Sequence, residues 1–177
     1  EDLALVVSQY DAEIERVDDL IGEFLDWLDE KDLLSETLVV VLSDHGDEFY
    51  EHGGVDHVHT LYDELLRVAW FMAGPGVPRG NEVERPVGLV DVMPTVCEIL
   101  DVQLASPVQG RSRVGSFDED DAKGPRGDDA LYAYGAYSEF PYRFESVRTG
   151  NWKLLRYFLA GMKARSASKR WTPALAS

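Results

Sequence analysis

The chain has 177 residues, of which 45% are hydrophobic, and it carries 33 Asp and Glu against 17 Lys and Arg. This hydrophobic content excludes a mainly disordered protein, and the length suits one domain or part of a larger one. The net charge of −16 repels nucleic acid and anionic lipid, so we expect neither as a partner. Because the acidic residues are spread along the chain, we favour adaptation to high salt as their explanation.

The first predicted element is a long amphipathic helix over roughly residues 4–30. Apolar residues recur there at steps of three and four between acidic positions: Ile14, Val17, Leu20, Ile21, Phe24, Leu25 and Leu28. A short, Val-rich apolar run follows at residues 38–42. Such a run is typical of a strand that is buried on both faces, as in a parallel sheet covered by helices.

A second strand is predicted over residues 67–73 and a second helix over residues 92–100. Asp91 is the expected N-cap of that helix, and Pro94 is tolerated in its first turn. Helices that alternate with strands in this way indicate an α/β layer. We therefore predict an α/β domain over residues 1–115.

The sequence changes in character after Gly110. Residues 116–129 are acidic and lack periodicity, which predicts an exposed loop. Strands are expected at 131–137, 145–148 and 152–158, with Thr149-Gly150-Asn151 as the hairpin turn between the last two. These strands predict a small antiparallel subdomain over 130–160, followed by a flexible tail over 161–177.

Cys97 is the only cysteine, so no intrachain disulfide can form, and its apolar surroundings predict a buried, inert thiol. No apolar run approaches the roughly 20 residues that span a bilayer, and no signal peptide is visible, so a cytoplasmic location is expected. The chain begins Glu1-Asp2 without an initiator Met, which suggests a piece of a longer protein.

All four histidines lie in one window: His45, His52, His57 and His59. Asp44 and His45 follow the predicted strand directly, at the strand end where α/β proteins bind ligands. A carboxylate beside an imidazole offers a divalent cation one hard oxygen and one borderline nitrogen. The alternative is that Asp44 caps a turn and His45 makes a structural hydrogen bond. Gly46 would let the backbone turn sharply under either interpretation.

His57 and His59 could each donate a proton or bind an anionic group, because imidazole titrates near neutrality. We expect only one of the two to face the site. The alternative for each is a solvated loop histidine. Asp47, Glu48 and Glu51 are predicted to belong to the acidic surface.

Six segments in order, within about residues 10–157, resemble the C-terminal half of sulfatases. They are SDHGDEFYEHGG, DHVHTLYDELLRV, GPGV, DVMPTVCEILDV, GRS and SVRTGNWKLL. Sulfatases belong to the alkaline-phosphatase-like superfamily of metal-dependent sulfate and phosphate ester hydrolases. The resemblance implies an α/β fold with a mixed or parallel sheet flanked by helices, a small C-terminal antiparallel subdomain, and a sulfate- or phosphate-ester substrate.

The resemblance also implies residue roles. Asp44 and His45 match the pair that coordinates the divalent metal, usually Ca²⁺, with Mg²⁺ or Mn²⁺ as alternatives. His57 matches the histidine that contacts the sulfate group and protonates the leaving oxygen. His52 and His59 are left as bystanders.

The chain departs from the family where the nucleophile is concerned. It contains no Cys/Ser-x-Pro-x-Arg motif, from which the family makes formylglycine, and Cys97 is followed by Glu98 instead. The formylglycine and the family's N-terminal Asp pair would lie in a missing N-terminal half. We therefore predict a sulfatase-like hydrolase fragment that is inactive alone. The alternatives are a phosphodiesterase or phosphoglycerol transferase of the same superfamily, or a non-catalytic degenerate domain.

Overall fold

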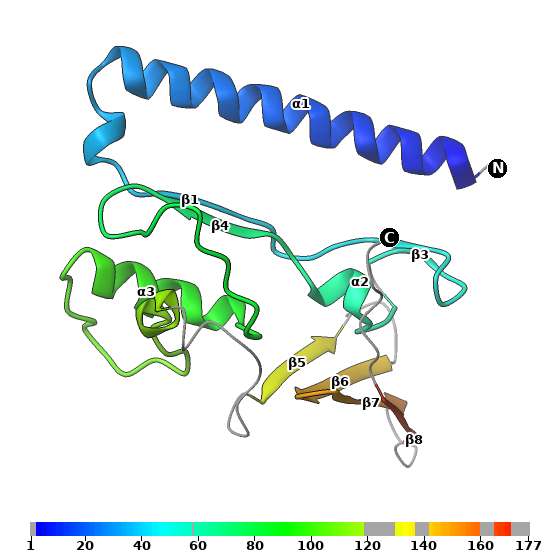
Figure 1. Cartoon of the computed structure of the whole chain (residues 1–177). Helices are drawn as coiled ribbons and strands as arrows, with labels where there is room; N and C mark the ends of the chain where they lie inside the picture. Colours follow the sequence, from blue (N-terminus) through cyan, green and yellow to red (C-terminus); the bar gives the residue numbers. More distant parts are fainter. Residues whose placement is uncertain (1–2, 58, 119–129, 137–141, 160–164, 171–177) are drawn as a thin grey trace.

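The computed structural model describes residues 3–57, 59–118, 130–136, 142–159 and 165–170 (Figure 1). The helices are α1 (Leu3–Glu30), α2 (Asp63–Leu66) and α3 (Val92–Ile99), with short 3₁₀ helices at Leu34–Glu36, Leu89–Asp91 and Val114–Phe117. The strands are β1 (Val39–Leu42), β2 (Glu48–Phe49), β3 (Val55–Asp56), β4 (Trp70–Ala73), β5 (Leu131–Ala136), β6 (Tyr142–Thr149), β7 (Trp152–Leu159) and β8 (Arg165–Arg170).

The long helix predicted over 4–30 is confirmed as α1. It ends where Asp32 adopts φ 58° and the N–H of Leu33 bonds the carbonyl of Leu28 at 2.9 Å, the backbone pattern that commonly closes a helix. Leu28 is buried, but most of the apolar stripe has no cover from the rest of the described chain. Phe24 is 55% exposed and Val17 52% exposed. The stripe is therefore an unpartnered apolar face.

We expect the 177-residue chain alone to melt without cooperativity and to aggregate in dilute buffer, because α1 and β1 leave apolar surface in water. The defect should be largest at low salt, where the net charge of −16 is unscreened and destabilises the compact state. Calorimetry and light scattering across a salt series measure both effects. A sharp, cooperative melt of monomeric protein in dilute buffer would contradict this expectation.

β1 pairs with β4 in antiparallel register, with Val39 opposite Ala73 and Leu42 opposite Trp70. The expectation that residues 38–42 have parallel neighbours and are buried on both faces is therefore wrong for the described chain, where β1 is half-buried and Leu42 is 43% exposed. The apolar run predicts a strand whose side chains are buried by neighbouring elements. The described elements bury the β1 side chains only in part.

Asp91 stands at the N-cap position of α3, as predicted, but its side chain does not cap that helix. Oδ2 instead accepts hydrogen bonds from the N–H of Gly88 at 3.1 Å and from Nε of Arg113 at 2.7 Å. Oδ1 accepts the N–H of Arg111 at 2.9 Å. Asp91 is 3% exposed, so this carboxylate ties the segment after α3 to the start of that helix in a buried setting.

β5 to β8 form an antiparallel sheet in that order, and the predicted turn joins β6 to β7 with Thr149 opposite Trp152 and Gly150 at φ 50°. Leu61, just before α2, packs with Phe144 and Leu155 of the sheet in a buried cluster. That contact attaches the histidine-bearing segment to the sheet.

Polar contacts strengthen the same attachment. Nζ of Lys153 lies 2.6 Å from Oδ1 of Asp63, and Nη1 of Arg148 lies 3.5 Å from Oδ2. Burial lowers the pKa of Lys153, and the carboxylate of Asp63 partly offsets the effect. α2 is thus held against the sheet by a nearly buried ion pair as well as by apolar packing.

Two C-terminal expectations differ from the structure. Residues 165–170, predicted to belong to a flexible tail, form β8 and pair with β7. Ser116, predicted to begin an exposed acidic loop, is 4% exposed in a 3₁₀ helix. The rest of that loop from 119, and positions 161–164 and 171–177 of the tail, lie outside the described residues.

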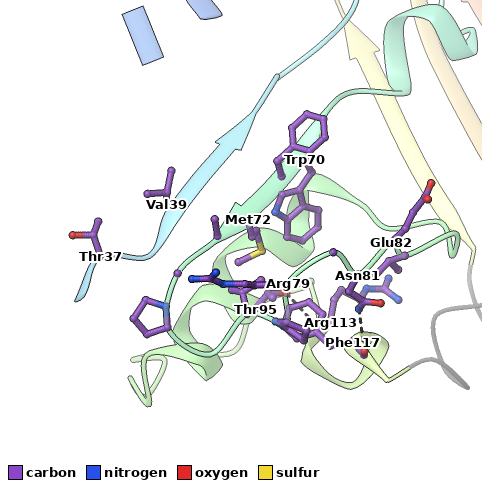
Figure 2. A pocket seen from close by; sticks show the side chains of 18 of the residues that line it. Thr37, Val39, Trp70, Met72, Arg79, Asn81, Glu82, Thr95, Arg113 and Phe117 are labelled. Atoms are coloured by element: carbon purple, nitrogen blue, oxygen red, sulfur yellow. Dashed lines mark hydrogen bonds between the residues drawn. The ribbon is translucent and has the colours of Figure 1, made fainter. Parts of the chain in front are cut away.

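A hollow of about 1130 Å³ lies beside β1 and β4 (Figure 2). Thr37, Val39, Trp70 and Met72 line it, together with Leu25 from α1. No histidine lines this hollow, so it is separate from the histidine window.

Candidate functional site

The chain leaves β1 through a loop that packs closely on α2. The N–H of Ser43 bonds the carbonyl of Ala69, and the N–H of Gly46 bonds that of Leu65 at 3.0 Å. A Cβ at position 46 would meet the carbonyl oxygen of Glu64 at 2.0 Å. Glycine is therefore required at position 46 because the backbone of this loop passes close to that of α2, and not because of the sharp turn expected from the sequence.

Gly46→Ala should lower the free energy of unfolding by about 1–3 kcal/mol, because the added methyl forces the loop off α2. Gly22→Ala is the matched control. Nothing lies within 4 Å of a Cβ at Gly22, which is in α1, so alanine should add about 0.5–1 kcal/mol there. Urea titrations in high-salt buffer, followed by circular dichroism, measure both changes. Equal effects of the two substitutions would show that the contact at Gly46 is not tight.

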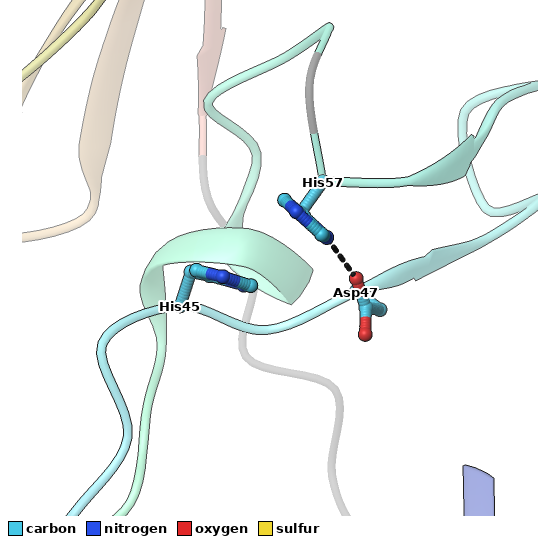
Figure 3. Close-up of side chains that lie close together, drawn as sticks. All are labelled: His45, Asp47 and His57. Atoms are coloured by element: carbon cyan, nitrogen blue, oxygen red, sulfur yellow. Dashed lines mark hydrogen bonds and ion pairs between the residues drawn. The ribbon is translucent and has the colours of Figure 1, made fainter.

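His45, Asp47 and His57 form one group, in which one ligand atom from each side chain lies within 4.8 Å of the others (Figure 3). The rings of His45 and His57 stack with centroids 4.1 Å apart. Nδ1 of His57 lies 2.7 Å from Oδ1 of Asp47 and 2.6 Å from Oδ1 of Asp56. Two imidazoles and a carboxylate thus converge in the loop after β1.

Asp44 lies at the edge of this group, with Oδ1 3.7 Å from Nε2 of His45. Its side chain is 86% exposed, and Oδ1 accepts the N–H of His45 at 2.9 Å. Asp47 takes the place beside His45 and His57, so the expectation that Asp47 belongs to the acidic surface is wrong. The sequence spacing could have indicated that Asp47 lies beside His45, because side chains two residues apart point to the same side of an extended backbone.

The carboxylates beside His57 also fix how its ring can be used. When Nδ1 carries the proton and donates it to Asp47, Nε2 is left to face a ligand or a metal ion. Asp47 is half-buried and so is His57, which keeps the pair partly shielded from water. The arrangement suits an imidazole whose orientation is set by a carboxylate.

A second group lies next to the first. Glu48 is 0% exposed, and Oε1 accepts the N–H groups of His52 at 2.9 Å and Gly54 at 2.8 Å. Burial raises the pKa of Glu48, but these two hydrogen bonds together with the nearby imidazoles of His59 and His52 outweigh it, so the pKa lies below its ordinary value. The expectation of a surface Glu48 is therefore wrong. Nε2 of His59 lies 3.2 Å from Oε2 of Glu48, and Nδ1 of His52 lies 2.5 Å from Oε1 of Glu64.

His57 and His59 contact different groups, so only one of them faces His45 and Asp47, as expected. His57 faces Asp47 and His45, whereas His59 faces Glu48. His52 stacks on Tyr62 with ring centroids 3.5 Å apart. The window therefore holds two separate polar groups.

The first group fits a divalent metal, as judged from its donor atoms. Imidazole and carboxylate together suit Zn²⁺ or Mn²⁺, whereas Ca²⁺ takes six to eight oxygens. His45 and Asp47 would hold the ion, with Asp44 near enough to His45 to join after a side-chain rotation. His57 lies beside them, and its Nε2 would remain available to the substrate.

The sequence model of the family described as Sulfatase matches residues 3–102, so the chain belongs to the sulfatase family. Human arylsulfatase K is 34% identical over 103 residues, which is 58% of this chain and 19% of the human protein. A sulfatase from Formosa agariphila is 29% identical over 109 residues, 62% of this chain and 21% of that protein. Mouse arylsulfatase K is 29% identical over 153 residues, 84% of this chain and 27% of the mouse protein.

Solved structures show the same fold. The putative sulfatase yidJ from Bacteroides fragilis matches with a TM-score of 0.71 and 20% identity, over 89% of this chain and 34% of that one. BT4656, solved with its substrate D-glucosamine-2-N,6-O-disulfate, matches with a TM-score of 0.69 and 22% identity, over 89% of this chain and 32% of that one. The predicted α/β, alkaline-phosphatase-like fold class is confirmed.

The chain therefore spans about a fifth to a quarter of the curated relatives' length. Within the part that the structure describes, no helix is both long and apolar enough to cross a bilayer.

Proposed function

We propose that this chain supplies one side of a sulfatase active site, which hydrolyses sulfate esters with a divalent metal. The observation that carries the proposal is the convergence of His45, Asp47 and His57 in a chain that belongs to the sulfatase family. The bound metal would polarise an oxygen of the ester. Asp44 and His45 remain our proposed metal ligands, to which the geometry adds Asp47.

His57 is the proposed catalytic residue. Its Nδ1 is held by Asp47 and Asp56, so Nε2 is the atom available to donate a proton to the leaving oxygen. A protonated ring would also balance negative charge on the sulfate group. Asp47 acts as a positioning residue, because it fixes the ring through the opposite nitrogen.

In this proposal the nucleophile lies outside these 177 residues, because the Cys/Ser-x-Pro-x-Arg motif does not occur in them. We propose that formylglycine is supplied in this way. The substrate class follows the relatives: BT4656 binds a sulfated amino sugar, and we propose a sulfate ester here as well.

A reconstitution assay tests the function. The chain alone should not hydrolyse nitrophenyl sulfate, and turnover should appear when a polypeptide carrying the formylglycine region of a sulfatase is added. Preference for a nitrophenyl phosphate diester over the sulfate would favour the phosphodiesterase alternative. Absence of both activities in a folded complex would favour a degenerate, non-catalytic domain.

We expect the chain alone to bind Ca²⁺ weakly, with a dissociation constant of about 1 mM or above, because one or two oxygens fall far short of the coordination that Ca²⁺ prefers. Isothermal titration with Ca²⁺, compared between the unchanged chain and Asp44→Ala, measures this directly. Micromolar affinity that disappears in Asp44→Ala would overturn the expectation.

A further inference from the structure

Glu48, His52 and Glu64 form a group, with His59 beside Glu48, in which hydrogen bonds alone do not satisfy every buried polar atom. Glu48 is fully buried, yet its Oε2 has no hydrogen-bond partner among the described residues, and the same holds for Nε2 of His59. The two atoms lie 3.2 Å apart, within the distance of an ion pair when His59 is protonated, but without the geometry of a hydrogen bond. A buried carboxylate oxygen with no such partner is costly unless a cation neutralises it.

The ligand atoms of Glu48, His52 and Glu64 all lie within 4.8 Å of one another. Zinc binds imidazole nitrogen at about 2.0–2.1 Å and carboxylate oxygen at about 2.0–2.2 Å, so tetrahedral ligand atoms stand roughly 3.4 Å apart. The pair of His52 Nδ1 and Glu64 Oε1, now 2.5 Å apart, would open by about 1 Å to admit an ion. That shift is within the reach of side-chain rotation.

The charges and exposure of the group also favour a cation. The group contains two carboxylates, whose negative charges a divalent ion would balance. Burial, the hydroxyl of Tyr62 and the nearby charges of Glu48 and Glu64 raise the pKa of Tyr157, in line with a negative local potential. The side chains of His52 and Glu64 are 29% and 16% exposed, so an ion has a route from solvent.

We propose that Glu48, His52 and Glu64 bind a divalent transition-metal ion of the zinc class, at a site separate from that of His45, Asp47 and His57. The ion would join the β2–β3 hairpin to α2, because Glu48 lies in β2 and Glu64 in α2. Gly54 makes room for this arrangement, since a Cβ there would meet Nε2 of His59 at 1.8 Å.

The test separates the two sites by substitution in the 177-residue chain. In a His45→Ala/His57→Ala background, which removes the first group, we expect one Zn²⁺ per chain by calorimetry, and Co²⁺ should give the visible d–d bands of a four-coordinate site. Adding Glu64→Gln should weaken Zn²⁺ binding at least about tenfold. Glutamine keeps an acceptor for His52, so a plain hydrogen-bond network would survive that change.

Glu51→Gln in the same background is the matched control, because Glu51 is exposed in the same loop and its carboxylate bonds the N–H of Phe49. It should leave Zn²⁺ affinity unchanged. The proposal is overturned when the background variant is folded by circular dichroism but binds no Zn²⁺, or when Glu51→Gln and Glu64→Gln weaken binding equally. Glu48→Gln, added to the same background, is a second test of the site. Zn²⁺ affinity equal to that of the background would also contradict the proposal.

Discussion

Replacing Asp91 with alanine is expected to lower the free energy of unfolding by about 3–5 kcal/mol, the cost of breaking a buried ion pair from one side. The carboxylate of Asp91 contacts Arg113 through Nε at 2.7 Å and Nη2 at 2.6 Å, and both side chains are less than a tenth exposed. Alanine also removes the acceptor for the N–H groups of Gly88 and Arg111. Each buried donor that loses its acceptor adds about 1–3 kcal/mol.

The surrounding bonds leave little room for relaxation. The hydroxyl of Thr95 donates to the carbonyl of Asp91 at 2.6 Å and accepts the N–H of Arg113 at 3.0 Å, and Thr95 is fully buried. A Cβ at Gly110 would meet the carbonyl oxygen of Val90 at 1.8 Å, so the segment before Arg111 is pressed against the start of α3. Water can therefore reach the vacated place only if the segment moves.

Glu98→Ala is the matched control, because Glu98 is an exposed carboxylate on the same helix. It should change the free energy of unfolding by less than about 0.5 kcal/mol. Urea denaturation of both variants, measured in the same high-salt buffer, separates the two effects. A loss below about 1 kcal/mol for Asp91→Ala would mean that the ion pair contributes little and that the segment 110–113 is held by other contacts.

The elements with strong periodicity can be predicted because the local pattern alone specifies them. The stripe from Ile14 to Leu28 has one helical period, and α1 forms there. The turn at Thr149-Gly150-Asn151 requires a residue that tolerates φ 50°, and glycine occupies that place. The sequence predicts β1 to within one residue. It does not predict the antiparallel pairing with β4, because an apolar run indicates burial but not the direction of the neighbouring strand.

The candidate site was predictable only in part. The sequence placed His45 and His57 in one window, and the structure brings their rings together. It gave no reason to separate Glu48 from its acidic neighbours, because its burial depends on closure of the loop that brings the N–H groups of His52 and Gly54 onto one carboxylate oxygen. Charge alone predicts exposure, and that prediction fails where backbone donors converge.

His57→Ala should reduce kcat for nitrophenyl sulfate by about 10²- to 10⁴-fold in the reconstituted enzyme, because general acid catalysis contributes that much when proton transfer limits the reaction. The loss should fall on kcat more than on KM, since the proton is transferred in the transition state. Asp47→Asn should give a smaller loss, of about tenfold or more, because it leaves the ring present but less firmly oriented.

The choice of ester separates acid catalysis by His57 from a purely structural role. A leaving group of low pKa needs little protonation, so an activated dinitrophenyl sulfate should lose much less rate in His57→Ala than an alkyl sulfate does. A folding defect would lower both rates by the same factor. Glu51→Gln, in the same loop but exposed, should leave both rates unchanged. If His57→Ala slows the activated and the alkyl ester equally, His57 is not the proton donor, and its stacking on His45 points to a role in holding the metal ligand instead.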